Sequence, residues 1–111
     1  GLADMVSTDH QLTDGIRLVH TPGHSPGHCA VMLESGGQTA MITGDMCHHP
    51  VQWPEPGWGH VVDSDQEMAA QTRRDISPGL LEDEVLIIGT HYPAPGAGKL
   101  VKHNGHFYLK P

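Results

Sequence analysis

The sequence is poor in the large side chains that usually fill a protein core. It has two Trp, two Tyr and one Phe among 111 residues. Leu, Ile, Val and Phe together make up about a fifth of the chain, a fraction close to the range in which disorder begins. The length therefore fits one domain with a thin core, and it excludes a multidomain protein.

Positive charge is also scarce, because 6 Lys and Arg stand against 13 Asp and Glu, for a net charge of −7. No basic stripe is present, which argues against binding to nucleic acid or to an anionic membrane. No apolar run approaches the ~20 residues that a bilayer requires. No signal peptide is visible, so we expect a cytoplasmic protein, with a signal peptide removed from a precursor as the alternative.

Cysteine is limited to Cys29 and Cys47, which do not form a Cys-x-x-Cys pair. Two isolated thiols are typical of a reducing cytosol, and a single disulfide is the alternative. The chain begins with Gly1 instead of Met. This predicts that the N-terminus is a processing product, a tag remnant or the edge of a fragment.

The sequence is rich in His, Gly and Pro, which number 10, 14 and 9. Alternating and apolar patterns predict strands at 15–20, 29–34, 38–43, 85–88, 99–103 and 106–109. A capping box from Ser64 to Glu67 predicts the start of a helix that Pro78 should end or break. Residues 47–63 form a long Pro/Gly/Trp-rich loop, a length typical of functional loops. This order of elements indicates an α+β fold with a mixed sheet and one main helix.

Metal-binding types of side chain directly follow three of the predicted strands. His24 and His28 follow the first strand, Asp45 follows the 38–43 strand, and His91 follows the buried 85–88 strand. Neighbouring strands that end at one edge of a sheet bring such residues together. A lone His at a strand end is typically structural, but three positions in register favour a metal site. His with carboxylate suits zinc, iron or manganese better than calcium.

These segments resemble the metal motifs of a known enzyme family. Thr-Pro-Gly-His-Ser-Pro-Gly-His at 21–28, Thr-Gly-Asp at 43–45 and Gly-Thr-His at 89–91 are similar to the last three metal motifs of the metallo-β-lactamase-fold hydrolases. The resemblance runs from about Thr8 to Leu109. Residues 44–52, 63–65 and 72–74 are most similar to the branch with methyl parathion hydrolase and the acyl-homoserine lactonases.

The resemblance implies half of an αββα sandwich and a site for two divalent metal ions, with zinc expected. It implies that His24 binds the first metal, that His91 binds the second, and that Asp45 bridges both as the catalytic residue. His28 is expected to support the loop behind the ligands. The implied reaction is hydrolysis of a small-molecule ester, lactone or phosphotriester by a metal-bridging hydroxide.

The family's first motif, His-x-His-x-Asp-His, is absent from this sequence. The resemblance therefore implies that residues 1–111 are the C-terminal half of the domain. We expect a hydrolase in the complete protein, and an inactive chain that holds one metal or none by itself. The alternative is a truncated, non-catalytic domain whose uncovered sheet face leads to a homo-oligomer.

Other residues carry weaker expectations. We predict that four residues line the substrate pocket, with packing or a surface position as the alternative: His48, His49, Trp53 and Tyr92. Trp53 and Trp58 are equally compatible with an exposed apolar patch. His20 is expected to be structural, and surface positions are expected for His10, His60, His103 and His106. Arg73 and Arg74 are expected to form solvated ion pairs with Glu67 and Asp65.

Overall fold

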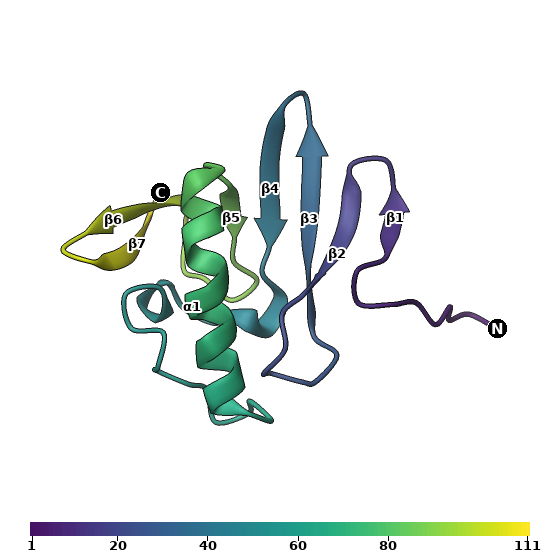
Figure 1. The fold of residues 1–111 in the computed structure, drawn as a ribbon, viewed down its shortest axis with the longest axis horizontal. Coiled ribbons are helices and arrows are strands. Elements are labelled where there is room, and N and C mark those ends of the chain that lie inside the picture. Colours follow the sequence, from purple (N-terminus) through teal and green to yellow (C-terminus); the bar gives the residue numbers. More distant parts are fainter.

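The computed structural model describes residues 1–111, and its strands form one mixed sheet (Figure 1). The sheet has 7 strands in sequence order. They are β1 Gln11–Thr13, β2 Ile16–His20, β3 Cys29–Ser35, β4 Gln38–Ile42, β5 Leu86–Ile88, β6 Ala97–His103 and β7 His106–Lys110. Only β4 and β5 pair in parallel. The expected mixed sheet with one main helix is confirmed.

Tight turns join the antiparallel strands where the sequence predicts them. Asn104 and Gly105 have φ angles of 48° and 81°. Positive φ at both central residues is what a two-residue hairpin turn requires, and Asn-Gly meets that requirement best. The short strand β1 is exposed along its whole length, and its single apolar residue, Leu12, is too little for an alternating pattern that would have predicted it.

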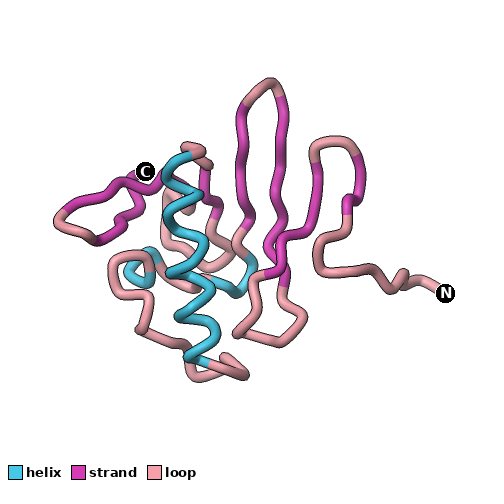
Figure 2. The backbone as a smooth tube through the Cα atoms, in the orientation of Figure 1, coloured by secondary structure: helices cyan, strands magenta, loops and turns pink.

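Helix α1, Gln66–Glu82, lies across one face of the sheet (Figures 1 and 2). Between them is a small core to which the loop after β4 also contributes. The buried apolar cluster consists of Ala30, Met32, Met41, Met46, Cys47, Trp53, Leu80, Val85, Ile87 and Leu100. The structure contains no helix with the length and apolarity needed to cross a membrane.

Both predicted ends of α1 were wrong. Asp65, not Ser64, caps the helix, since its carboxylate accepts a hydrogen bond from the Met68 amide at 2.9 Å. The Ser64 hydroxyl instead donates to the carbonyl oxygen of His24. The helix also passes through Pro78, because Ser77 and Leu80 around it are buried against the core. Pro78 itself is exposed, where water can satisfy the carbonyl group that loses its amide partner.

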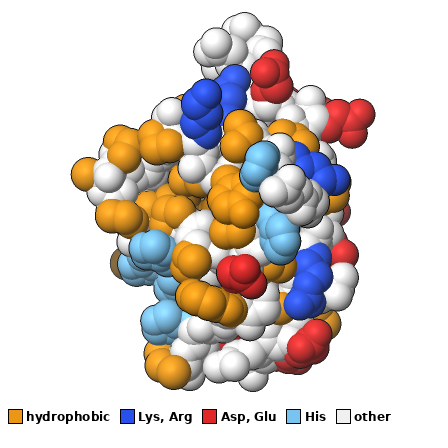
Figure 3. All heavy atoms as spheres, turned by 90° about the vertical axis from the view of Figure 1, so that its left-hand side faces the viewer, with side chains coloured by type: hydrophobic (Ala, Val, Ile, Leu, Met, Phe, Trp, Pro, Cys, Tyr) orange, Lys and Arg blue, Asp and Glu red, His pale blue; other side chains and the backbone are white.

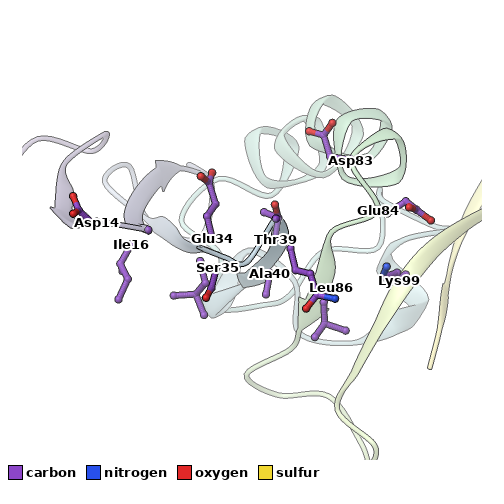
Figure 4. Close-up of a pocket in the computed structure, with 14 residues that line it drawn as sticks. Asp14, Ile16, Glu34, Ser35, Thr39, Ala40, Asp83, Glu84, Leu86 and Lys99 are labelled. Atoms are coloured by element: carbon purple, nitrogen blue, oxygen red, sulfur yellow. The ribbon is translucent and has the colours of Figure 1, made fainter.

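The sheet face opposite α1 is apolar and has no covering layer. Figure 4 shows Ile16, Ala40 and Leu86 pointing away from the side on which Asp83 lies. Strand β5, predicted to be buried, is therefore buried on one face only: Ile87 is 0% exposed and Leu86 is 39% exposed. Strand alternation places further apolar residues on the open face, namely Leu18, Val31, Leu33, Ile42 and Ile88.

The two cysteines are free thiols, as the favoured interpretation predicted. Cys47 is completely buried, and burial raises the pKa of its thiol to about 11. The thiolate is the reactive form of cysteine, so Cys47 acts here as a small apolar core residue.

Arg73 lies in the interior instead of in a solvated ion pair. Its side chain is fully buried, and its Nη1 donates to the carbonyl oxygen of Met46 at 2.9 Å. Nε and Nη2 both donate to the carbonyl oxygen of Pro56, at 3.1 and 2.8 Å. The guanidinium group thus ties α1 to two points of the loop that follows β4, one near its start and one near its middle. Arg74 is the residue that pairs in solvent, with Glu67.

Replacing Arg73 with Ala should therefore destabilise the protein strongly. The change leaves the buried carbonyl group of Met46 and the partly buried carbonyl group of Pro56 without these donors and opens a cavity, so we expect the free energy of unfolding to fall by about 3–5 kcal/mol. The neighbouring Arg74→Ala substitution should change it by less than about 0.5 kcal/mol. Urea denaturation of both variants measures this difference. Equal losses of unfolding free energy in the two variants would contradict the role of Arg73 in holding the loop to α1.

Candidate metal centre

Three strands end at one edge of the sheet and bring their following loops together. Strands β2, β4 and β5 run in the same direction, so their C-terminal ends meet there, at the lower edge in Figure 1. His24, Asp45 and His91 lie in the segments that follow these strands. The structure therefore brings together the three residues that the sequence predicted as metal ligands.

The carboxylate of Asp45 stands between imidazole rings from different loops. Its Oδ1 lies 2.7 Å from Nε2 of His91, and its Oδ2 lies 3.3 Å from Nε2 of His24. Nε2 of His48 lies 3.8 Å from Oδ1. Burial alone would raise the pKa of Asp45, but the hydrogen bond with His91 and the neighbouring rings outweigh it and lower that pKa. Each oxygen of an ionised carboxylate thus faces a different ring.

His28 supports this arrangement from behind. Its Nε2 accepts a hydrogen bond from the Asp45 amide at 2.9 Å, so its proton resides on Nδ1, which lies 3.1 Å from the carbonyl oxygen of Thr21. Burial lowers the pKa of His28 and favours this neutral form. His28 therefore connects the loop before β3 to the loop after β4, and neither of its nitrogen atoms is free to bind a metal.

The loop after β4 supplies further rings to the site. His48 stacks on His60 with centroids 4.3 Å apart and on His91 with centroids 5.3 Å apart. His60 had been predicted on the surface, and this was wrong. No spacing motif marks His60, and only its place in the long functional-type loop could have indicated it.

A hollow opens at this cluster. It is lined by His24, Asp45, His48, His49, His60, Val62 and His91. Figure 3, which faces the side of the molecule with β6 and β7, shows several His side chains among apolar atoms. Trp53 and Tyr92 are not brought to the hollow. Trp53 is 2% exposed, and its indole N–H donates to the Tyr92 hydroxyl at 2.8 Å within the core.

The donor atoms of the cluster suit a divalent metal. Ligand atoms of Asp45, His48 and His91 lie within 4.8 Å of one another, and so do those of His24, His48 and Asp63. Nδ1 of His48 is buried and has no hydrogen-bond partner. An unpartnered buried nitrogen among imidazole and carboxylate donors matches the ligand preferences of zinc and related ions.

A second hollow lies at the opposite edge, where β2, β4 and β5 begin (Figure 4). Its lining includes Asp14, Glu34, Glu84 and Lys99 but no His or Cys. Nitrogen donors for a metal therefore gather at the other edge of the sheet.

Comparison with solved structures identifies the fold. AidC, a dizinc quorum-quenching lactonase in complex with a product, superposes with a TM-score of 0.84 and 25% identity over 96% of this chain. The hydrolase AbOPH of the beta lactamase superfamily superposes with a TM-score of 0.81 and 28% identity over 89% of it. The chain has the metallo-β-lactamase fold. Its resemblance to that superfamily, predicted from the motifs, is confirmed.

The likeness covers part of these proteins only. The chain spans 36% of the length of AidC and 35% of AbOPH. A curated N-acyl homoserine lactonase from Bacillus sp is 39% identical over 31 residues, which are 28% of this chain and 12% of that protein. No family model matches the sequence.

The close approach of His28 to Gly44 yields a test of the site's scaffold. Gly44 has φ 54°, and a Cβ atom there would lie 2.7 Å from Nε2 of His28. Gly36 has φ 56° but open space around it. Ala at either position should cost ~1–2 kcal/mol for the left-handed backbone. Gly44→Ala should cost about 1–3 kcal/mol more, because it displaces the ring. Chemical denaturation of both variants measures this, and equal costs would refute the contact.

Proposed function

We propose that this chain is the C-terminal half of a metallo-β-lactamase-fold hydrolase. Its substrate would be a small lactone, ester or phosphotriester. The observation that carries the proposal is the Asp45 carboxylate, whose two oxygens face imidazole nitrogens from two different loops. A carboxylate placed in this way can accept one cation on each oxygen, and neutral imidazole completes the donor set.

His24, Asp45 and His91 would hold the metal, with zinc as the first expectation. A bound divalent ion would activate water at neutral pH and polarise the oxygen of the scissile group. The chain's own residues prepare the place for this. Asp45 is kept ionised by the rings around it, and His28 fixes its main chain.

The substrate class is supported by the neighbours and by the lining of the hollow. AidC is described as a lactonase, and the curated relative is an N-acyl homoserine lactonase. His48 and His49 line the hollow and offer ring nitrogens to a carbonyl or phosphoryl oxygen. Tyr92 and Trp53 would contribute from the core, by holding the loops that carry His91 and His48.

We propose that residues 1–111 alone, without metal-binding residues from elsewhere, hold a metal ion weakly and do not turn substrate over. The residues that bind two metals in the family include the His-x-His-x-Asp-His motif, which this sequence lacks. One ion bound by His24, Asp45 and His91 would fit the donors that are present.

Metal binding tests this proposal directly. Zinc titration against a chromogenic chelator should detect one site, and Asp45→Ala should weaken it by more than ~10–100-fold, the loss typical of removing a supporting partner. His103→Ala, on the β6–β7 hairpin, should leave the affinity unchanged. Lactone and aryl ester hydrolysis should stay at background. A wild-type chain that binds no zinc, or an Asp45→Ala variant that binds it normally, would contradict the metal centre.

The open sheet face favours a second candidate function, a non-catalytic domain that self-associates. Ile42 and Leu86 are 37% and 39% exposed on a face that carries mostly apolar side chains. Contiguous apolar surface of this kind marks an interface more often than a free surface. A homo-oligomer that packs two such faces together would remove it from water.

Sedimentation velocity over a range of concentrations tests this candidate. The wild-type chain should show a concentration-dependent dimer, and Leu86→Lys should shift it to monomer because it places a charge in the apolar interface. Met68→Lys provides the matched control, since Met68 is 45% exposed on α1, on the other side of the sheet. A wild-type monomer at all concentrations would rule out self-association.

A further inference from the structure

Asp63 places a buried carboxylate directly beside the candidate metal centre. Its side chain is 0% exposed. Burying an ionised carboxylate is costly unless it is paired and hydrogen-bonded. Two donors from different places satisfy it: Nδ1 of His24 lies 3.1 Å from Oδ1, and the His60 amide donates to Oδ2 at 3.0 Å. His24 is 39 positions away in the sequence, so the fold has built this contact.

The contact with Asp63 bears on which nitrogen of His24 carries the proton. A carboxylate only accepts hydrogen bonds, so the neutral ring must carry its proton on Nδ1 to bond with Asp63. Nε2 then keeps its lone pair. It lies 3.3 Å from the Asp45 carboxylate, a second acceptor that competes with Asp63 for the single proton of the neutral ring. Metal-binding His residues commonly donate their second N–H to a carboxylate in this way.

We propose that Asp63 is a positioning residue that holds His24 in the Nδ1–H form, with Nε2 directed at the metal. This inference rests on the metal centre proposed above. Asp63 acts through His24 and does not itself need to touch metal or substrate. Its role is to make the ligand nitrogen available and to fix the plane of the ring.

The second oxygen of Asp63 extends this role to the wall of the hollow. It fixes the amide of His60, whose ring stacks on His48 at 4.3 Å. Nδ1 of His60 accepts a hydrogen bond from the Val62 amide, which stabilises the turn after His60. One carboxylate thus connects the orientation of a ligand to the position of the His48–His60 stack.

Two neighbouring residues hold the same segment without touching an imidazole, and they provide matched controls. The Ser64 hydroxyl donates to the carbonyl oxygen of His24 at 2.7 Å. The Asp65 carboxylate caps α1 through the Met68 amide. If Asp63 merely braced the loop, the loss of either neighbour should resemble the loss of Asp63.

The decisive variant is Asp63→Asn in the 111-residue chain. Its amide offers one acceptor oxygen to two donors, so either His24 or the His60 amide loses its partner. We expect zinc affinity, measured by chelator competition, to fall ~10–100-fold. Ser64→Ala and Asp65→Ala should keep wild-type affinity, even though the second change removes the N-cap of α1. Unchanged affinity in Asp63→Asn, or an equal loss in both controls, would overturn the inference.

A second measurement does not depend on metal. Long-range ¹⁵N NMR of the metal-free chain at about pH 8.5, above the ordinary pKa of His, reports the tautomer of His24. We expect Nδ1–H in the wild-type chain and in both controls, and a shift toward Nε2–H in Asp63→Asn. An Nε2–H ring in the wild-type chain would overturn the inference. If the wild-type chain bound no zinc, the metal centre would fail, and the tautomer would still decide the role of Asp63.

Discussion

The parallel pairing of β4 with β5 is the constraint on which the rest of this structure depends. Two parallel strands cannot be joined by a tight turn, and they need a long crossover. Here the crossover contains the loop after β4 and all of α1. The same pairing makes β4 and β5 end at one edge, so that Asp45 and His91 meet there. The parallel direction of β4 and β5 therefore accounts both for the helix that packs on the sheet and for the meeting of the candidate ligands at its edge.

At that edge, the hydrogen bonds that each imidazole ring makes determine whether one of its nitrogens is available to bind a metal. His28 uses both nitrogens in hydrogen bonds to the main chain and side chain around it, and so it is structural. His24 directs one nitrogen at a buried carboxylate and the other at Asp45. Two His from one Pro-Gly-His repeat therefore have different roles, because the fold gives them different partners. Residue type alone does not distinguish them.

Local signals in the sequence predicted strands β2 to β7, the Asn104-Gly105 turn and the gathering of candidate ligands at strand ends, because each depends on neighbouring residues. Three of the errors share a different cause. Ser64 matches a capping box, but its hydroxyl bonds to His24 across the fold. Arg73 is buried by carbonyl groups of an irregular loop, which no periodicity describes. His60 reaches the hollow through that same loop. Contacts between irregular segments leave no pattern in the chain.

The metal centre and the open sheet face are physically connected, because β4 and β5 contribute to both. Ile42 and Ile88 lie on the open face, and the segments with Asp45 and His91 begin immediately after them. A layer that packed on this face would restrict the strand ends and so order the loops with the candidate ligands. If such a layer raises the affinity of this edge for a metal ion, the metal ion must stabilise the packing of the layer by the same free energy, because coupling between two binding events is reciprocal.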